Sequence, residues 1–286
     1  MIDPNICIKP DLPASATVAC QGVEGAYSQI AASAAFGQPD IMYMRTFDGV
    51  FRAVDKGLCR YGMLPVENST AGTVTDVYDL MKAYHFYIVR GVKVSISHML
   101  LSKEKLAADK IKAVYSHEQA VKQCSRFLEE NQHIKVNYCA NTAAAARMVA
   151  ESTDKNAAAI ASESCAELYG LTVSARNVQN NNSNYTRFIC ISKECEIFSG
   201  SDKISLMITL EHKAGSLYET IKHFAALGLN LTKLESRPIA GTDFEFMFYF
   251  DFQANIENRD VYDLLIRLEK DARQFVFLGN YREVAA

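Results

Sequence analysis

The sequence predicts an α/β protein with two lobes around a cleft, followed by a smaller module of strands and helices. From Thr17 to about Ile191, short apolar runs alternate with amphipathic stretches of roughly ten residues, as in strands joined by helices. The long extended segment Ile88–Leu101 separates two such series, so each series is expected to form one lobe. After the polar, Gly- and Ser-containing linker Glu194–Asp202, the order changes to β-α-β-β-α-β.

The elements of the two lobes follow from the period of their apolar residues. The first lobe is expected to have strands at Thr17–Cys20, Ile41–Met44 and Tyr61–Val66, and helices at Ala26–Phe36, Phe47–Lys56 and Val74–Ala83. The second is expected to have strands at Ala113–Tyr115, Val136–Cys139 and Ala157–Ile160, and helices at Glu118–Asn131 and Thr142–Ser152. This alternation predicts mostly parallel sheets, which bind ligands at the carboxyl ends of their strands. The cleft between the lobes is therefore the expected site.

The C-terminal module has the pattern of a ferredoxin-like split β-α-β unit. Its strands are expected at Lys203–Leu210, Leu231–Glu235, Phe244–Phe252 and Gln274–Leu278, and its helices at Ser216–Leu227 and Val261–Lys270.

The composition is that of a globular protein with a large core. The chain has 286 residues, of which 49% are apolar and 22% charged, and a net charge of −3, which argues against a nucleic-acid partner. None of its eight cysteines forms a C-x-x-C pair, so reduced thiols are expected, with no disulfide and no metal site. The N-terminus lacks the basic start and apolar run of a secretory signal, and no apolar run approaches the ~18 residues of a membrane span. We therefore expect a cytoplasmic protein without a membrane partner.

Three segments place polar residues where strands are expected to end. Gln21–Ser28 contains two glycines between a strand and a helix, a turn that either binds an anion at the helix N-terminus or is a plain connection. Leu64–Thr73 carries Asn68 among short polar side chains that either cap a helix or bind a carboxylate. Its Glu67 is harder to explain as a cap. Asn184–Phe188 enters an apolar strand and is unremarkable in isolation.

Three further segments are ordinary when taken singly. Ser116 and Gln119 have the spacing of a capping box, so the intervening His117 is expected at a capped helix start. Gly215–Tyr218 opens the first helix of the C-terminal module, and Glu235–Pro238 ends its second strand.

Together these segments resemble the prephenate dehydratase family over about residues 17–282. The glycine turn, P-x-E-N-S (65–69) and N-Y-T-R-F (184–188) occur in the family's order, and G-S-L-Y and E-S-R-P (215–218 and 235–238) resemble the phenylalanine-binding segments of its ACT domain. The resemblance implies a two-lobed catalytic domain like type II periplasmic binding proteins, followed by a ferredoxin-like ACT domain. It implies a catalytic domain at 1–198, with lobe 1 at about 16–92 and 174–195 and lobe 2 at about 93–173, and an ACT domain at 203–282. The chorismate mutase domain that often precedes this one in the family is not expected.

The resemblance also implies roles for residues of these motifs. Thr186 is the expected hydrogen-bond donor to the departing hydroxide of prephenate, with Glu67 as the second candidate acid and Arg187 as a further catalytic residue. Neighbouring residues of a regular strand face opposite ways. Either the backbone is irregular here, or Arg187 acts from behind the site or ties the lobes together, which is the favoured expectation. The expected substrate-binding residues are Gly25, Tyr27, Ser28, Asn68, Ser69, Thr73, Asn184 and Phe188. No cofactor is implied.

The C-terminal motifs imply feedback control by L-phenylalanine. The expected effector-binding residues, shared between the ACT domains of a homodimer or homotetramer, are Gly215, Ser216, Leu217, Tyr218, Glu235, Ser236, Arg237 and Pro238.

Departures from the family pattern leave the substrate open. Ala26 stands where many members have Thr, and Cys20 and Glu24 also differ. The nearest alternative activity is the same reaction on arogenate, the amino counterpart of prephenate. A non-catalytic amino-acid sensor is the alternative from another class, since two-lobed folds also bind solutes. A regulatory subunit that acts through its ACT portion is a third.

Overall fold

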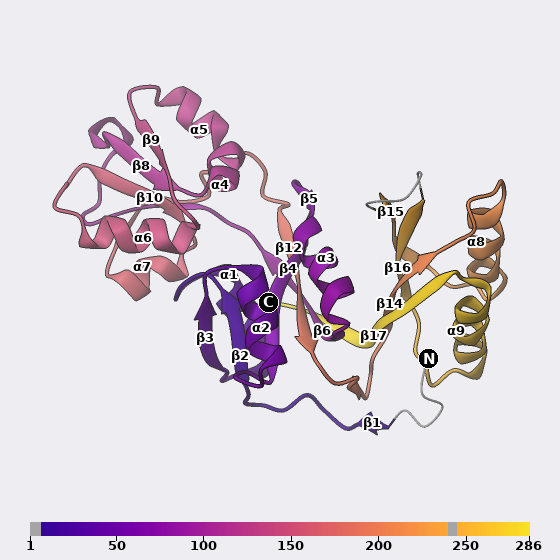
Figure 1. Cartoon of the computed structure of the whole chain (residues 1–286). Coiled ribbons are helices and arrows are strands. Elements are labelled where there is room, and N and C mark those ends of the chain that lie inside the picture. Colours follow the sequence, from indigo (N-terminus) through magenta and orange to yellow (C-terminus); the bar gives the residue numbers. More distant parts are fainter. Residues whose placement is uncertain (1–6, 240–244) are drawn as a thin grey trace.

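The computed structural model describes residues 7–239 and 245–286, which form two lobes and a C-terminal module (Figure 1). The sheet of the first lobe has the order β3-β2-β4-β12-β6, with β5 paired to β4. Its strands are β2 (Thr17–Gln21), β3 (Asp40–Met44), β4 (Tyr61–Asn68), β5 (Gly72–Thr73), β6 (Tyr87–Ser95) and β12 (Tyr185–Ser192). The helices that pack on it are α1 (Tyr27–Phe36), α2 (Phe47–Asp55) and α3 (Thr75–Tyr84).

The second lobe is a smaller sheet with the order β11-β7-β10-β8-β9. Its strands are β7 (Met99–Ser102), β8 (Ala113–Ser116), β9 (Lys135–Tyr138), β10 (Ala157–Ala161) and β11 (Thr172–Ala175). Its helices are η1 (Ala108–Lys110), α4 (Glu118–Gln123), α5 (Ser125–Glu130), α6 (Thr142–Glu151) and α7 (Ser164–Tyr169). The side chains of β10 are alanine and isoleucine, all buried, which lets α6 pack closely on the sheet.

Two crossing segments connect the lobes. The chain leaves the first lobe after β6 and returns between β11 and β12. The two crossings are hydrogen-bonded to each other, from Ile96 N–H to the Asn184 carbonyl (2.8 Å) and from Val178 N–H to the His98 carbonyl (2.9 Å). The two crossings are thus fixed to each other between the lobes.

The C-terminal module has the order β15-β16-β14-β17 with two helices packed on one face (Figure 1). Its elements are β14 (Lys203–Thr209), α8 (Ser216–Ala226), β15 (Leu231–Pro238), β16 (Phe246–Gln253), α9 (Arg259–Asp271) and β17 (Gln274–Ala285). The C-terminal half of β17 pairs in parallel with β6, so the module and the first lobe share a ten-stranded sheet over the described residues. Gly279 is required where β17 passes from one partner to the other, because a Cβ there would lie 2.2 Å from the Ile88 carbonyl oxygen.

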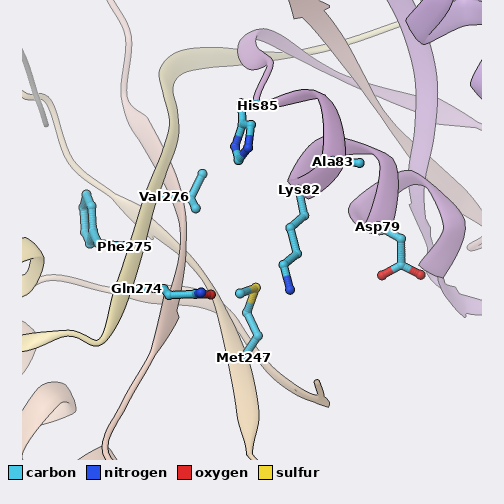
Figure 2. Close-up of a pocket in the computed structure, with 8 residues that line it drawn as sticks. All are labelled: Asp79, Lys82, Ala83, His85, Met247, Gln274, Phe275 and Val276. Atoms are coloured by element: carbon cyan, nitrogen blue, oxygen red, sulfur yellow. The ribbon is translucent and has the colours of Figure 1, made fainter. Parts of the chain in front are cut away.

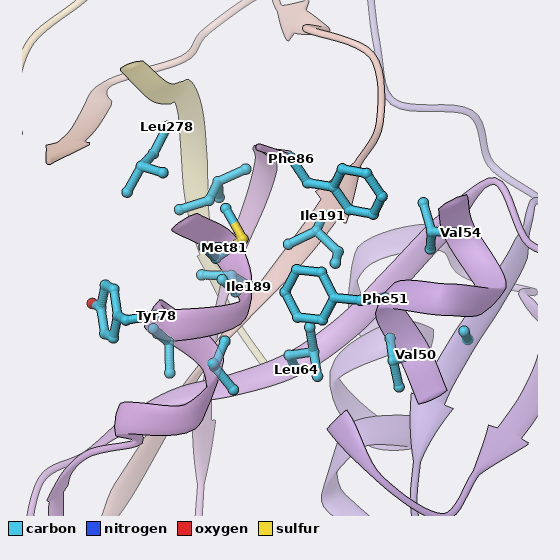
Figure 3. Close-up of a cluster of buried hydrophobic side chains, with 14 of the residues drawn as sticks. Val50, Phe51, Val54, Leu64, Tyr78, Met81, Phe86, Ile189, Ile191 and Leu278 are labelled. Atoms are coloured by element: carbon cyan, nitrogen blue, oxygen red, sulfur yellow. The ribbon is translucent and has the colours of Figure 1, made fainter. Parts of the chain in front are cut away.

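A single hydrophobic core joins the first lobe to the module. In Figure 3, Phe51 of α2 and Met81 of α3 lie over strand residues such as Leu64 and Ile189, and Leu278 of β17 lies in the same cluster. Burial of this apolar surface favours one fixed arrangement of lobe and module over two loosely tethered bodies.

The structure differs from the sequence prediction in several elements. The sheets are mixed rather than mostly parallel, because β12 runs antiparallel to both β4 and β6, and β7 runs antiparallel to β10 and β11. The helix predicted at 118–131 is interrupted at Cys124. The strand predicted at 274–278 extends to Ala285. Phe244, the first residue of the strand predicted at 244–252, lies outside the described residues.

The predicted linker is ordered where it meets the first lobe. Its β13 (Ile197–Phe198) pairs with β1 (Ile8–Lys9), and the buried Glu196 carboxylate accepts hydrogen bonds from Arg60 and Tyr61 (both 2.8 Å). Among the described residues, no helix is both long and apolar enough to cross a membrane.

Candidate active site

A cavity of about 400 Å³ lies between the two lobes. The first lobe contributes Gln21, Ala26, Tyr27, Ser28, Asn68, Thr186 and Phe188 among others, and the crossing and second lobe contribute Ile96, His98, His117, Gln119, Gln123, Asn141 and Thr142. A larger hollow of about 550 Å³ lies between α3 and the C-terminal sheet, where Lys82, His85 and Gln274 line it (Figure 2). Because the motif residues meet in the smaller cavity and not in the larger one, the smaller cavity is the candidate active site.

The Thr186 hydroxyl is held by Asn68 so that its own hydrogen is available to the cavity. The two residues face each other across β12 and β4. The Asn68 amide oxygen accepts the N–H groups of Thr70 (3.0 Å) and Ala71 (2.8 Å), which directs its amide nitrogen to the Thr186 oxygen (2.9 Å). Since that oxygen already accepts a hydrogen bond, its O–H group remains free to donate.

Asn184 and Ser69 support this arrangement from outside the cavity lining. The buried Asn184 side chain accepts a second hydrogen bond from the Asn68 amide nitrogen (2.9 Å). The Ser69 hydroxyl accepts the N–H of Tyr185 (2.9 Å), and the Ser69 N–H donates to the Tyr185 carbonyl (2.9 Å). The structure thus places Asn68, Ser69 and Asn184 as a brace for Thr186. The Asn68 amide hydrogens are directed to protein atoms, which differs from the expectation that they bind a substrate carboxylate.

Tyr27, Ser28 and Phe188 line the cavity, as predicted from the sequence. The hydroxyls of Tyr27 and Ser28 already donate hydrogen bonds to backbone carbonyls. The Tyr27 hydroxyl donates to the Ser97 carbonyl (2.6 Å), and burial raises the pKa of Tyr27, so this side chain stays neutral. The Ser28 hydroxyl donates to the Gln21 carbonyl (2.7 Å). Phe188 is buried and provides an apolar wall.

Gly25 lies at a contact between the lobes and does not line the cavity, contrary to the expectation that it binds substrate. Its N–H donates to Gln29 (2.6 Å), and a Cβ at this position would lie 2.9 Å from Leu168 of α7. The neighbouring Glu24 carbonyl accepts the Tyr169 hydroxyl (2.5 Å), also on α7. The glycine at this left-handed position (φ +85°) therefore lets α7 approach the turn closely.

The second lobe presents the carboxyl ends of β8 and β9 to the cavity. His117 caps α4 by accepting the Gln119 N–H (3.2 Å), and Asn141 caps α6 by accepting the Ala144 N–H (2.7 Å). The predicted capping box at Ser116 is wrong, because the Ser116 hydroxyl donates to the Ile160 carbonyl (2.7 Å). Burial lowers the pKa of His117, although the neighbouring Glu118 opposes this, so its ring favours the neutral form.

No residue that lines the cavity within the described ranges carries a formal charge, apart from the titratable histidines. The N-terminal ends of α1 and α6 lie at the cavity instead, through Tyr27, Ser28 and Thr142. The positive ends of these helix dipoles favour anions without a cationic side chain.

Glu67 and Arg187 lie on the opposite face of the same strands, against the C-terminal module. Arg187 pairs with Asp251 and with Glu283 (2.6 Å) and donates to the Tyr281 hydroxyl. Burial lowers the pKa of Arg187, but the negative groups around it outweigh burial and raise it, so the guanidinium remains charged. Arg187 therefore ties the catalytic sheet to the module. The predicted tie between the two lobes is wrong.

Glu67 and Thr73 also contact the C-terminal module. The Glu67 carboxylate pairs with the buried Lys233 (3.2 Å), and the Thr73 hydroxyl donates to Glu235 (2.6 Å). Neither residue lines the cavity, so the structure does not support Glu67 as the second candidate acid or Thr73 as a substrate ligand. The reason is strand alternation, which turns Glu67 away from the face that Asn68 presents.

The two predicted effector motifs lie on α8 and β15. Ser236 and Pro238 of the second motif pair with Phe248 and Phe246, whose rings line the hollow beside the first motif. Gly215 (φ +88°) starts α8 beside a hollow of about 320 Å³ lined by Ser216, Leu217 and the rings of Phe246 and Phe248. Tyr218 is 66% exposed. On β15, Glu235 and Arg237 face the catalytic lobe, where Arg237 lies 3.8 Å from Asp79 of α3, while Ser236 and Pro238 are exposed.

The sequence reasoning missed the residues that the second lobe contributes. His98, Gln119, Gln123, Asn141 and Thr142 all line the cavity. For Gln119, Asn141 and Thr142, a usable signal was their position just beyond the carboxyl ends of two expected parallel strands. His98 and Gln123 carried no such signal, since one lies in a crossing segment and the other within a helix.

A family model described as prephenate dehydratase matches residues 18–196. This chain belongs to the prephenate dehydratase family. A bifunctional chorismate mutase/prephenate dehydratase of Escherichia coli K12 is 34% identical over 275 residues, covering 94% of this chain and 71% of that protein. A chloroplastic arogenate dehydratase/prephenate dehydratase 2 of Arabidopsis thaliana is 34% identical over 276 residues, covering 92% and 72%.

Two solved structures resemble this family member over almost its whole length. A prephenate dehydratase from Arthrobacter aurescens in complex with L-Phe has a TM-score of 0.82 at 27% identity and covers 93% of this chain and 90% of its own. A protein described as GqqA, a novel type of quorum quenching acylase, has a TM-score of 0.83 at 29% identity and covers 94% and 98%.

Proposed function

We propose that this chain converts prephenate to phenylpyruvate, carbon dioxide and water in the cleft between its lobes. The observation that carries the proposal is the Thr186 hydroxyl, which lines the cavity with its oxygen already bonded to Asn68 and its hydrogen free to donate. Membership of the prephenate dehydratase family supports the same reaction.

The reaction needs a donor for a poor leaving group. As the ring carboxylate departs as CO₂, its bonding electrons enter the ring, the ring C–O bond breaks, and the oxygen takes up a proton, supplied in the end by solvent, to leave as water. The departing oxygen becomes more basic while this bond breaks, so the hydrogen bond from Thr186 strengthens in the transition state. A donor placed in this way accelerates such a step by roughly a hundred- to ten-thousandfold.

The uncharged cavity suits the carboxylate that is lost. A cation beside the ring carboxylate would stabilise the charged ground state and oppose decarboxylation, whereas an apolar wall such as Phe188 does not. The substrate is still a dianion, and the N-terminal ends of α1 and α6 supply a positive potential for the carboxylate that is retained.

The test of this proposal is turnover of prephenate, followed by the absorbance of phenylpyruvate. We expect turnover by the wild-type chain and a kcat lower by roughly a hundred- to ten-thousandfold with Thr186→Ala. A wild-type chain that binds prephenate but does not convert it would instead support the non-catalytic sensor.

Arogenate is the second substrate to compare, because one relative is named for both dehydratase activities. Arogenate carries an ammonium group where prephenate carries a ketone. Values of kcat/KM measured side by side for the two substrates decide between them.

We further propose that residues 203–282 form an ACT domain that binds L-phenylalanine, and that residues 1–198 form the catalytic domain. The strand order of the module and the L-Phe complex of a relative support this proposal. We propose that the effector site is shared between the ACT domains of a homodimer or homotetramer. Calorimetry with L-phenylalanine, and sedimentation with and without it, test both parts, and inhibition of turnover tests feedback.

A second candidate activity follows from the resemblance to a protein described as a quorum quenching acylase. That activity would hydrolyse the acyl group from an acylated quorum-sensing signal. Chromatographic detection of the released carboxylic acid tests it. If Thr186→Ala lowers this release as well as prephenate turnover, both reactions use the same cleft.

A further inference from the structure

His98 is held rigidly at the floor of the cavity. It lies in the first crossing segment, its side chain lines the cavity, and the residue is only 2% exposed. Its N–H donates to the Gln179 side chain (2.9 Å), and its carbonyl accepts the Val178 N–H (2.9 Å). Its ring is oriented by Gln123, whose side-chain oxygen lies 2.8 Å from Nε2.

This arrangement leaves one ring nitrogen of His98 as an unused acceptor. Burial lowers the pKa of His98, so the ring is neutral near pH 7. In the tautomer that pairs with the Gln123 oxygen, Nε2 carries the ring proton and Nδ1 carries a lone pair. Nδ1 is buried and has no hydrogen-bond partner among residues 7–239 and 245–286. A buried polar atom without a partner is costly, which indicates that a ligand supplies one.

The chemistry of the substrate selects the partner of this acceptor. At neutral pH prephenate has two carboxylates and a ketone, all of which accept hydrogen bonds. Its ring hydroxyl is the single group that donates. A neutral, unprotonated nitrogen therefore repels the acceptor groups of prephenate and pairs with the hydroxyl.

Resting on the proposed dehydratase function, we propose that His98 Nδ1 accepts the hydrogen of the substrate's ring hydroxyl and so turns the lone pairs of the leaving oxygen toward Thr186. As the oxygen takes up its second proton, its original O–H becomes more acidic, and its hydrogen bond to Nδ1 strengthens. The contribution of His98 therefore grows toward the transition state and appears mainly in kcat.

Two substitutions separate the two ring nitrogens. In His98→Gln the amide nitrogen reaches the place of Nε2 and still donates to Gln123, but the acceptor at Nδ1 is lost. In His98→Asn the amide oxygen stands in the place of Nδ1 and the contact with Gln123 is lost. We expect His98→Gln to lower kcat by about ten- to a hundredfold and His98→Asn to retain most of it. The reverse order would overturn the proposal.

A pair of unreactive ligands isolates the contact from any effect on folding. The probes are prephenate with its ring saturated, which prevents aromatisation, and the same compound without its ring hydroxyl. Calorimetry should show that wild type prefers the hydroxylated probe by about tenfold and that this preference is smaller in His98→Gln, where the contact with Thr186 remains. An equal preference in both proteins would show that His98 has only a structural role.

The outcomes also separate this proposal from the proposed function. No turnover of prephenate by wild type would refute the dehydratase function itself. Normal turnover by wild type together with wild-type kcat in His98→Gln would refute the role of His98 alone.

Discussion

The two faces of the paired strands β4 and β12 have opposite character. On one face, Asn68 and Thr186 meet in an uncharged cavity. On the other, Glu67 and Arg187 enter a cluster of charges shared with the C-terminal module. Each of two short motifs thus supplies one residue for chemistry and its neighbour for attachment, because successive strand residues point to opposite faces.

This division has a physical advantage for a decarboxylation. A charged side chain beside the ring carboxylate would stabilise the ground state, so charges are better kept away from the substrate. Behind the sheet, Arg187 and Asp251 are both nearly buried and form an ion pair. Arg187 also donates to the Tyr281 hydroxyl, and Asp251 also accepts from the Ser205 hydroxyl. The same strands can therefore carry a neutral site and a charged contact without mixing them.

The largest effect is expected on the cavity face, at Thr186. Thr186→Ala removes the donor to the leaving oxygen and should lower kcat by roughly a hundred- to ten-thousandfold, with little change in KM. Thr186→Ser keeps the hydroxyl and is the matched control. Steady-state kinetics on prephenate make the measurement, and a near-normal kcat for the alanine variant would remove Thr186 from the mechanism.

The counterpart is Arg187 on the other face of these strands, which we call the attached face because Glu67 and Arg187 contact the C-terminal module there. Arg187→Met leaves the Asp251 carboxylate, whose side chain is 5% exposed, without its partner, and should cost about 3–5 kcal/mol of stability. The shift of the urea midpoint measures the loss. The control is Arg147→Gln, which breaks an ion pair whose side chains are 59% and 66% exposed and should cost less than about 1 kcal/mol. Unchanged stability with a lost kcat would instead place Arg187 in the chemistry.

Strand alternation predicted that the two faces differ, but it did not predict what covers the face of Arg187. Strand alternation indicated from the sequence that Thr186 and Arg187 point to opposite faces. What covers the Arg187 face depends on β17, whose predicted end at Leu278 gave no sign that it continues to Ala285 and pairs with β6. That pairing joins residues nearly two hundred positions apart, and no local pattern of apolar residues encodes it.

The residues that line the cavity could also be predicted only in part from the sequence. The first-lobe residues Tyr27, Asn68, Thr186 and Phe188 were predicted from motifs and do line it. Gly25 and Glu67 belong to those same motifs but face α7 and the C-terminal module, because a motif gives the order of residues and not their direction. His98 was missed because its role depends on Gln123 and on burial, which only the folded chain reveals.

A smaller effect on the cavity face is expected for Asn68→Asp. The aspartate still accepts the N–H groups of Thr70 and Ala71, so the turn should keep its shape. Its second oxygen now faces Thr186 as an acceptor, so the Thr186 hydroxyl donates to it instead of to the substrate. We expect kcat to fall by about ten- to a hundredfold. Thermal melting serves as the control for folding, and a wild-type kcat would show that Asn68 does not orient the hydroxyl.

The smallest effect is expected for Glu67→Gln, which tests the division directly because Glu67 is the sequence neighbour of Asn68. Its carboxylate is 37% exposed and lies on the attached face with Lys233, so the loss of charge should cost less than about 1 kcal/mol by urea unfolding. The amide can still accept a hydrogen bond from Lys233, and kcat should stay within about twofold of wild type because nothing at the cavity changes. A fall in kcat comparable to that of Thr186→Ala would mean that Glu67 reaches the substrate in the working enzyme, and the separation of the two faces would then hold only for the free protein.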